Sequence, residues 1–399
     1  MLHRSITSRE PRWAAVWGIA TMSSLGETTA VLARLRKAMK RQSSRVDDGG
    51  LVEVRGFGFN PGGLRMLAYV PQGLAPGAPV VVILHGCTQR AGPHARAAGW
   101  LDLADRLGFA VLAPEQGVEN NPNRCFNWFE PGDIARDSGE AASIHAMVQH
   151  IVRARGLDPA RVFVTGFSAG GAMTSVLLAT YPEAFAAGAV VAGLPFGLAG
   201  NVQEAFAAMH GRARISSREL GALVEQAAPA PTRRPRLAIW HGQADGTVAS
   251  RNAAALASQW AVCHGLAEQP DEVRIRRDWT RSVWRASDGE ALIEMNLLAG
   301  LGHGTPLAAG GDDPIGEVAP FMLEAGVSSS LEIARFWGLA PPEAAAQADA
   351  WNPSSQAAVQ PRTHARGLGE SVMASVSPHV SDDVQRLIAK ALASAGLIR

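Results

Sequence analysis

The sequence predicts an α/β fold in which a mostly parallel sheet is covered by helices on both faces. Short apolar runs alternate with segments of helical periodicity from residue 66 to residue 298, and strands that alternate with helices form parallel sheets. Some runs are apolar at every position, as at 80–84, which is typical of a strand buried on both faces. With 399 residues, the chain is long enough for one large domain or two ordinary ones.

The expected elements follow each other in order along the chain. Runs rich in Val, Ile and Leu that are bounded by turn residues predict strands, and apolar positions three or four residues apart predict helices. Strands are expected at 66–70, 80–84, 109–113, 162–165, 189–192, 237–240, 273–277 and 293–298. Helices are expected at 97–107, 140–155, 169–180 and 252–263.

The composition excludes several classes of protein. The chain has 37 Lys and Arg against 36 Asp and Glu, a net charge of +1, so no field of one sign favours nucleic acid or an acidic membrane. Its 42 Gly and 24 Pro follow no repeat, which excludes collagen-like chains. Residues 184–203 are uncharged but contain four Gly and a Pro. We therefore expect them to form a buried strand with its loop, and we expect no membrane span.

Both ends of the chain differ from the middle. Residues 1–49 are expected to be an N-terminal arm. An apolar run at 13–21 imitates a signal peptide but is short, and Met22 offers an alternative start. Residues 22–45 have the period of a basic amphipathic helix. The main domain is expected at 50–338. Residues 339–399 are expected to be a mobile tail rich in Ala, Pro, Gly and Ser, ending in a helix at 381–397.

The pattern Gly166-Phe167-Ser168-Ala169-Gly170 lies between an expected strand and an expected helix. A serine on a tight strand-to-helix turn, flanked by small residues, is typical of a nucleophile elbow. The N-terminus of the helix that follows stabilises negative charge at the turn. The alternative is a glycine-rich turn with an idle serine. The strand-turn-helix setting favours Ser168 as a nucleophile.

A serine nucleophile needs a histidine base and a carboxylate that orients it. In folds with this elbow, the acid precedes the histidine in the chain. Asp245 is expected in the loop after the strand at 237–240, where parallel sheets place ligand-facing residues, and His303 follows the last expected strand between glycines. We therefore expect Asp245 as the acid and His303 as the base. The rival candidates are Asp271 and Asp278 for the acid and His241 and His264 for the base.

The tetrahedral intermediate of acyl transfer needs two backbone N–H donors. One is expected from Ala169, directly after the nucleophile. The other is expected from the loop at 84–88, after an early strand, where we favour the Cys87 N–H. His85 in this loop is a base by residue type, but a histidine at a strand end more often supports the loop as a satisfied polar group.

Five blocks occur in order along the chain, at 84–89, 121–129, 166–171, 181–185 and 241–245. Together they resemble the esterase family named after poly(3-hydroxybutyrate) (PHB) depolymerases, over about residues 50–338. The resemblance implies an α/β-hydrolase fold and ester hydrolysis, with Ser168, Asp245 and His303 as the catalytic triad. Within these blocks, substrate-binding residues are expected at His85, Gly86, Trp128 and Phe167.

The chain departs from the family pattern in two places. Many relatives carry Trp-Pro after the histidine of the triad, whereas Gly304-Thr305-Pro306 follows His303 here. The resemblance therefore does not predict which residues form the rim of the substrate site. Depolymerases that attack solid polymer usually append a binding module, and residues 340–399 are too polar and too short for one. We therefore expect little attack on crystalline polymer.

The three cysteines lack the spacing of metal ligands, so no zinc site is expected. Cys87 and Cys125 both lie in family blocks. They are either joined by a disulfide, which implies an oxidising compartment, or are buried thiols of a cytosolic enzyme. Cys263 is expected to be an unpaired core residue. The resemblance favours an extracellular or periplasmic destination, and the weak N-terminal signal leaves the cytoplasm open.

The sequence therefore predicts a serine esterase that hydrolyses short-chain hydroxyalkanoate esters or oligomers through an acyl-enzyme, without a metal or organic cofactor. The first alternative is a feruloyl or acetylxylan esterase, because the family resembles both. An acyltransferase with the same triad and a non-catalytic binding protein of the same fold are further alternatives. An ester substrate, possibly a polyester, is the partner expected; nucleic acid is not, and the oligomeric state is left open.

Overall fold

The computed structural model describes residues 48–212, 215–229, 233–310 and 313–342 of the chain. The amphipathic helix expected at 22–45 and the terminal helix expected at 381–397 therefore lie outside the described residues, as does almost all of the expected arm and tail. Within the described residues, no helix combines the length and the apolar character that a membrane crossing requires.

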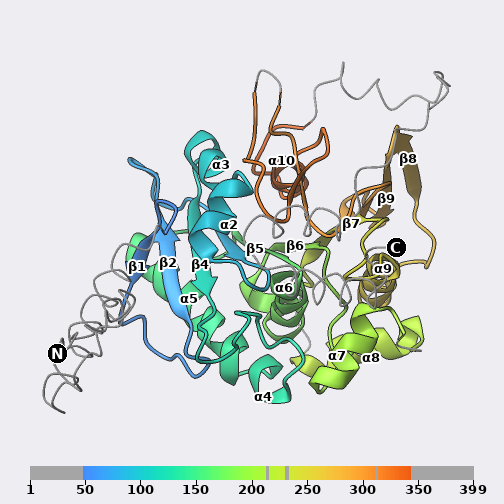
Figure 1. Ribbon diagram of the computed structural model, residues 1–399, viewed down its shortest axis with the longest axis horizontal. Coiled ribbons are helices and arrows are strands. Elements are labelled where there is room, and N and C mark those ends of the chain that lie inside the picture. The colour runs from blue at the N-terminus through green and yellow to red at the C-terminus, as the bar shows by residue number, and fades with distance from the viewer. Residues whose placement is uncertain (1–47, 213–214, 230–232, 311–312, 343–399) are drawn as a thin grey trace, which may run out of the picture. The chain divides into compact units, whose positions relative to one another are not determined.

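In the part of the chain described, ten strands form one sheet in the order β1-β2-β4-β3-β5-β6-β7-β10-β9-β8 (Figure 1). The run from β4 to β10 is parallel, and antiparallel pairs complete both edges. The strands are β1 (Val52–Val54), β2 (Arg65–Tyr69), β3 (Val80–Leu84), β4 (Ala110–Glu115), β5 (Val162–Phe167), β6 (Ala187–Val191), β7 (Arg236–Gly242), β8 (Glu272–Arg276), β9 (Trp279–Arg285) and β10 (Ala291–Leu298).

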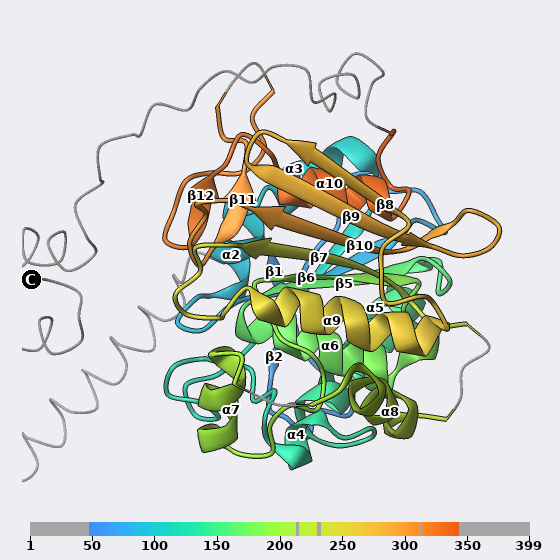
Figure 2. The same ribbon diagram turned by 90° about the vertical axis from the view of Figure 1, so that its right-hand side faces the viewer.

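Helices cover both faces of this sheet (Figure 2). Three of them, α2, α3 and α10, pack on one face, and α5, α6 and α9 pack on the other (Figure 2). A second, two-stranded parallel sheet joins β11 (Thr305–Leu307) to β12 (Met322–Glu324). The helices are α2 (Ala91–Ala97), α3 (Trp100–Leu107), α4 (Pro131–Ile134), α5 (Gly139–Arg155), α6 (Ala169–Thr180), α7 (Val202–Met209), α8 (Ser217–Ala227), α9 (Arg251–His264) and α10 (Ser329–Phe336).

The central strands are apolar at every position because they feed two cores. Val80, Val82 and Leu84 of β3 face the core under α5, α6 and α9, whereas Val81 and Ile83 face the core under α2, α3 and α10. Side chains alternate between the faces of a strand, so continuous apolar sequence places apolar surface on both sides. All five side chains are fully buried. The expectation of a mostly parallel sheet covered on both faces is confirmed.

The helix expected at 97–107 is wrong in its bounds, because two helices, α2 and α3, meet there. The break is at Gly99, whose φ of 80° lies in the left-handed region. A Cβ at this position would also lie 2.6 Å from the Ile315 side chain and 2.8 Å from the Gly316 backbone. Glycine therefore allows both the turn and the close approach of a distant segment.

The sequence missed the elements whose apolar content is low. Strand β9 contains two Arg, a Thr and a Ser among its seven residues. Compared with the apolar sequences of the central strands, this sequence is more typical of a loop. Asp278 lies in the turn between β8 and β9. Helix α8 was also missed, although Ser216 and Glu219 form a capping box at its start. The remaining missed elements are short: β1, α4, α7, β11, β12 and α10.

One edge of the sheet collects the candidate functional residues. The carboxyl ends of parallel strands lie at the same edge, and loops there carry the functional groups of α/β proteins. The loops that follow β3, β5, β7 and β10 contain Cys87, Ser168, Asp245 and His303 respectively. The fold thus brings together residues that are up to 216 positions apart in the chain.

Candidate active site

Ser168 occupies the turn between β5 and α6 in a strained backbone conformation. Its φ and ψ are 55° and −117°, a combination that a residue with a side chain rarely adopts and that concentrates at functional sites. Gly170 permits the turn, because a Cβ there would collide with the Leu84 and His85 carbonyl oxygens. The Ser168 side chain is therefore held at the N-terminus of α6, beside the loop that follows β3.

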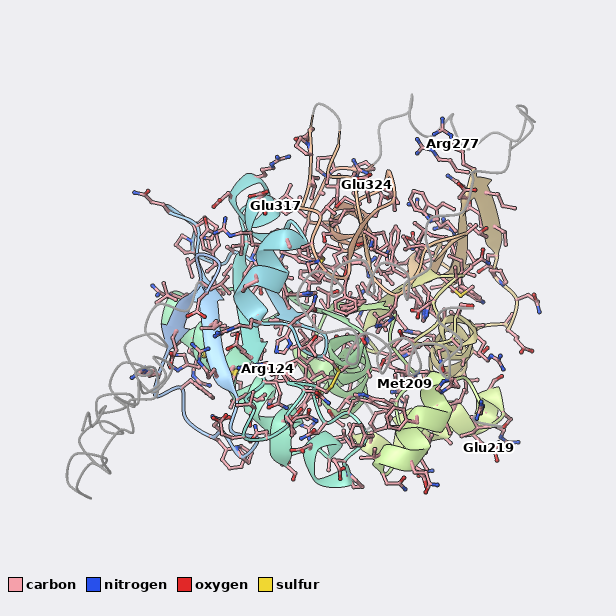
Figure 3. All side chains as sticks on the ribbon, in the orientation of Figure 1. Arg124, Met209, Glu219, Arg277, Glu317 and Glu324 are labelled. Carbon is pink, nitrogen blue, oxygen red and sulfur yellow. A yellow bond between two sulfur atoms is a disulfide. The ribbon has the colours of Figure 1, made fainter. Side chains whose placement is uncertain are left out.

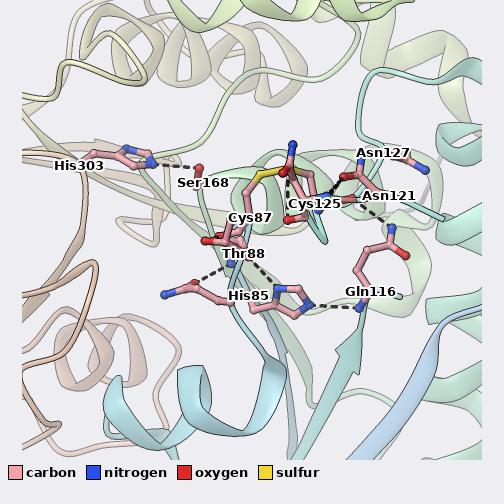
Figure 4. The surroundings of a disulfide bond; sticks show 12 residues. His85, Cys87, Thr88, Gln116, Asn121, Cys125, Asn127, Ser168 and His303 are labelled. Atoms are coloured by element: carbon pink, nitrogen blue, oxygen red, sulfur yellow. Dashed lines mark hydrogen bonds between the residues drawn. A yellow bond between two sulfur atoms is a disulfide. The ribbon is translucent and has the colours of Figure 1, made fainter. Parts of the chain in front are cut away.

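Ser168, His303 and Asp245 form a hydrogen-bonded row. The distance between Ser168 Oγ and His303 Nε2 is 3.0 Å, and that between His303 Nδ1 and Asp245 Oδ2 is 2.7 Å. When Nδ1–H donates a hydrogen bond to the carboxylate, Nε2 carries no proton. Nε2 can then accept the proton of the serine hydroxyl. Figure 4 shows the contact between His303 and Ser168. The geometry is that of a nucleophile, a base and a group that orients the base.

The Asp245 carboxylate is buried and richly hydrogen-bonded. Its Oδ1 accepts the backbone N–H groups of Thr247 and Val248, at 2.8 and 2.9 Å, and its Oδ2 also lies 3.4 Å from His241 Nε2. Burial alone would raise the pKa of Asp245, but the hydrogen bonds from His241, His303 and the backbone outweigh it and lower the pKa well below its ordinary value. Asp245 is thus held as a carboxylate against the imidazole.

The rival candidates lie elsewhere or have other partners. Asp271 accepts the Arg285 N–H at 2.7 Å, beside β9, and Asp278 lies in the β8–β9 turn. His264 Nε2 lies 3.1 Å from the Pro235 carbonyl oxygen at the end of α9. His241 touches Asp245 but its Nε2 also lies 2.9 Å from the Val248 carbonyl oxygen, so it supports the loop that carries the carboxylate.

The two expected oxyanion donors belong to loops that pack against each other. The Ala169 N–H belongs to the first turn of α6, where amides have no intrahelical acceptor. Cys87 follows β3 in a loop closed by the 2.8 Å hydrogen bond from Gly86 N to Gln89 Oε1. The close packing of Gly170 on the carbonyls of residues 84 and 85 brings the two loops together.

Cys87 and Cys125 form a disulfide (Figure 4). It joins the loop after β3 to the loop at 119–130, and the Thr88 N–H donates to the Asn123 carbonyl oxygen at 2.7 Å beside it. The loop that carries the Cys87 N–H is therefore tied to its neighbour twice. Cys263 is free and partly buried on α9. Burial raises the pKa of its thiol to about 11, which makes it a poor nucleophile.

The expectation that His85 binds substrate is wrong. The ring has no exposed surface, and both nitrogens have internal partners: Nδ1 lies 2.8 Å from the Gly86 carbonyl oxygen and Nε2 accepts the Gln116 N–H at 3.1 Å. His85 also packs on Phe126, with 5.0 Å between ring centroids. Neither ring nitrogen is left for a ligand, and His85 supports the loop after β3 from behind.

The other three expected substrate-binding residues are also covered. Phe167 is 2% exposed, lies against Gly86, and its ring centroid lies 4.8 Å from that of His303. Trp128 is 7% exposed and packs edge-to-face on Phe129. Phe167 therefore packs against the His303 ring and supports it from the core side.

Two buried polar residues behind the disulfide were not anticipated. The Gln116 side chain donates to the Cys125 carbonyl oxygen at 3.1 Å and to the Glu140 carboxylate, and Glu140 Oε2 accepts the Asn127 N–H at 2.9 Å. Burial and the nearby Asp133 carboxylate raise the pKa of Glu140 to about 8, against the lowering effect of these hydrogen bonds. No local pattern signals this network, because its members are far apart in sequence.

A cleft of about 680 Å³ opens beside the same loop. Its lining includes Asn121, Asn127, Phe129 and Asp133, and it contains none of the three residues of the hydrogen-bonded row. Among the described residues, no group of three or more His, Cys, Asp or Glu side chains is placed to hold a metal ion.

Comparison with known proteins gives consistent results. Residues 64–280 match the family model described as "Esterase PHB depolymerase". The chain is 40% identical over 291 residues to poly(3-hydroxyalkanoate) depolymerase C of Paucimonas lemoignei, covering 72% of this chain and 70% of that protein. It is 29% identical over 265 residues to feruloyl esterase B of Talaromyces funiculosus, covering 64% of this chain and 73% of that protein.

A solved esterase structure is also similar to this chain. The acetyl xylan esterase from Aspergillus awamori superposes with a TM-score of 0.62 at 25% identity, covering 73% of this chain and all of that one. Because the family model matches more than half of the chain and a curated relative is similar over most of its length, the relationship extends beyond the elbow motif. The protein belongs to the PHB depolymerase family of esterases, has the α/β-hydrolase fold and is a carboxylic ester hydrolase.

Proposed function

We propose that the protein hydrolyses short-chain hydroxyalkanoate esters or oligomers with Ser168, His303 and Asp245 as its catalytic triad. The hydrogen-bonded row from Ser168 Oγ through His303 to Asp245 carries this proposal. A non-catalytic protein would have no use for a strained serine that is hydrogen-bonded to an oriented imidazole. The family membership supplies the reaction class, ester hydrolysis.

The reaction proceeds in two stages. Ser168 Oγ attacks the ester carbonyl while His303 takes its proton, and the oxyanion is stabilised by the N–H groups of Cys87 and Ala169 and by the N-terminus of α6. His303 then gives the proton to the leaving alcohol, which leaves an acyl-enzyme. Water attacks the acyl-enzyme, His303 accepts a proton from it, and the proton returns to Ser168 as the acid departs. Asp245 holds the imidazole tautomer throughout.

The substrate assignment follows the relative with the greater identity. That relative is named for poly(3-hydroxyalkanoate), at 40% identity, whereas the feruloyl esterase is 29% identical. A specific observation favours the second candidate, a carbohydrate-linked acetyl or feruloyl ester: the acetyl xylan esterase structure is covered along its whole length. The same triad serves either substrate, because specificity lies in the surroundings of the reacting atoms.

A panel of esters tests the proposal. The purified chain is given 3-hydroxybutyrate oligomers, acetylated xylo-oligosaccharides, methyl ferulate and p-nitrophenyl esters of increasing acyl length, with and without Ser168→Ala. We expect the highest kcat/KM on the hydroxybutyrate oligomers and a loss of about 10⁴-fold in Ser168→Ala on every substrate. Higher kcat/KM on the sugar or ferulate esters would select the second candidate. Transfer of the acyl group to an alcohol in preference to water would indicate an acyltransferase.

A further inference from the structure

Phe321 is the exposed member of a cluster of three rings at the candidate site. It lies between β11 and β12, directly before Met322. Its ring centroid lies 6.2 Å from that of His303, at an interplanar angle of 77°, and 6.0 Å from that of Phe167. Phe167 is 2% exposed, whereas Phe321 is 39% exposed. The cluster therefore runs from the core, past the imidazole, to the protein surface.

The backbone of Phe321 is held in an unfavourable conformation. Its φ is 65°, in the left-handed region that a bulky side chain rarely occupies, at a cost on the order of 1–3 kcal/mol. The Phe321 carbonyl oxygen accepts the Thr305 N–H at 2.8 Å, two residues after His303. This bond ties the segment of Phe321 to the loop of the candidate base. The strain persists because that bond and the pairing of β11 with β12 hold the segment in place.

Core packing does not account for an exposed aromatic ring in a strained conformation. Such backbone outliers cluster at functional sites, and the other strained residues include Ser168 itself and Thr88 and Arg124 beside the disulfide. Phe321 also lies outside the residues matched by the family model, which end at 280. The family match therefore gives no account of this ring, and its role has to be argued from its contacts.

The mechanism indicates which part of the substrate meets this ring. His303 must deliver its proton to the alcohol oxygen as that alcohol leaves, so the alcohol group lies against the imidazole. The carbonyl oxygen instead lies with the N–H groups of Cys87 and Ala169. Figure 4 shows His303 on one side of Ser168 and Cys87 with its disulfide on the other. A ring that packs on His303 therefore borders the alcohol side of the site.

We propose that Phe321 determines the selectivity of the enzyme for the alcohol portion of its ester, by contact with an apolar face of that alcohol. The proposal rests on the triad assigned under Proposed function. In an oligomer of 3-hydroxyalkanoate, the alcohol portion is the next unit of the chain, whose oxygen-bearing carbon carries an alkyl group. The exposed ring offers apolar surface to that group, and apolar contacts of this size change relative kcat/KM by about 10- to 200-fold.

Two series of esters separate this role from the alternatives. In the first, butyrate is esterified to ethanol, isobutanol, cyclohexylmethanol and benzyl alcohol; in the second, ethanol is esterified to acetate, butyrate, hexanoate and octanoate. For Phe321→Ala, we expect the ratio of kcat/KM for benzyl butyrate over ethyl butyrate to fall by at least about 10-fold. Phe321→Leu should give a smaller fall. The acyl series should keep its ratios within about twofold, since the acyl group lies on the other side.

Val318→Ala is the matched control. Val318 is 67% exposed in the same segment, and its truncation removes apolar surface without touching the ring cluster. It should leave both series unchanged. The hydrolysis of the common butyryl-enzyme, followed as the slow phase after a burst with p-nitrophenyl butyrate, should be unchanged in Phe321→Ala because the alcohol has already left.

Each other result would overturn the proposal. An equal fall for all esters, with slower hydrolysis of the acyl-enzyme, would mean that Phe321 only positions His303. A shift confined to the acyl series would place the ring on the acyl side, and unchanged ratios in both Phe321 variants would mean that it contacts neither portion. Failure of the triad is distinguishable, because it shows as ester turnover that survives in Ser168→Ala whatever the alcohol ratios are.

Discussion

The candidate site has two walls that are built differently. The oxyanion wall consists of residues 84–90 and 119–130, and the histidine wall consists of residues 299–306 together with Phe321. The first is joined by the disulfide between Cys87 and Cys125 and is backed by buried Gln116 and Glu140. The second exposes the aromatic ring of Phe321. In Figure 3, Glu317 and Glu324, which flank Phe321 in sequence, lie above the level of Arg124 from the oxyanion wall.

This difference matches two demands of ester hydrolysis. The family match at 64–280 includes the oxyanion wall, Ser168 and Asp245, and it ends before His303 and Phe321. The oxyanion and the nucleophile have the same geometry for every ester, and a rigid preorganised wall serves them best. The alcohol differs from one substrate to the next. Under our proposal, the exposed ring of Phe321 meets this variable portion.

The largest effect is expected where the two walls meet, at His303. His303→Ala should lower ester turnover by about 10⁴-fold or more, because triad members act as a unit. The measurement is kcat/KM on a p-nitrophenyl ester, with thermal unfolding to verify the fold. His210→Ala is the control, since His210 is exposed and, within the described part of the chain, its ring bonds to the Phe206 carbonyl oxygen of its own helix. Retention of more than a tenth of the activity in His303→Ala would remove this residue from the triad.

Asp245→Asn tests whether the carboxylate in the loop after β7 orients the His303 imidazole. The amide does not replace the carboxylate as the acceptor of the Nδ1–H hydrogen bond, so the imidazole adopts the wrong tautomer. Turnover should therefore fall by roughly 10⁴-fold. Asp271→Asn and Asp278→Asn should leave turnover nearly unchanged, because neither carboxylate is bonded to His303. A mild effect at Asp245 with a severe one at Asp271 or Asp278 would assign the acid elsewhere.

Removing the disulfide tests the rigid wall alone. Cys87→Ser and Cys125→Ser should each lower turnover by on the order of 10²-fold, the usual effect of losing one oxyanion donor. The bridge closes a loop of 38 residues, which corresponds to about 4 kcal/mol of stability in the chain-entropy model. A non-reduced digest should show Cys87 linked to Cys125, with Cys263→Ser as the silent control. Full turnover without the bridge, measured well below the melting temperature, would show that the wall needs no cross-link.

The smallest effect is expected behind the oxyanion wall, at Glu140. In the folded protein its pKa is raised to about 8, against an ordinary value of 4.5. Between these two pH values the unfolded chain binds fewer protons at this site than the folded protein does, so stability falls as pH rises through this window. Glu140→Gln should flatten this part of the dependence of the melting temperature on pH.

Glu183→Gln is the control for this experiment. Burial raises the pKa of Glu183, but its bond with Arg136 outweighs burial and lowers the pKa below 4.5, so its contribution is lost only as pH falls below that window. The same slope in wild type and Glu140→Gln between pH 5 and 8 would contradict a protonated Glu140 behind the wall.

The sequence predicts the central strands and the reacting side chains better than the residues that surround them. Continuous apolar runs identify β3 and the other central strands, and strand-turn-helix context identifies Ser168. His85 was expected both to support its loop and to bind substrate, because residue type does not reveal that both ring nitrogens are used inside the fold. Gln116 and Glu140 lie 24 residues apart, and burial of such a pair is not visible in local patterns. Phe321 was missed since its neighbours, His303 and Phe167, come from distant loops.

Labelling of the nucleophile tests the central claim most directly. The native protein is incubated with a fluorophosphonate, from whose phosphorus an activated serine displaces fluoride, and the modified peptide is located by tandem mass spectrometry. We expect one adduct, on Ser168, formed in parallel with the loss of esterase activity. The adduct should be absent in Ser168→Ala and slow to form in His303→Ala. An adduct on another residue that accompanies inactivation, or full inactivation with Ser168 unmodified, would contradict the account.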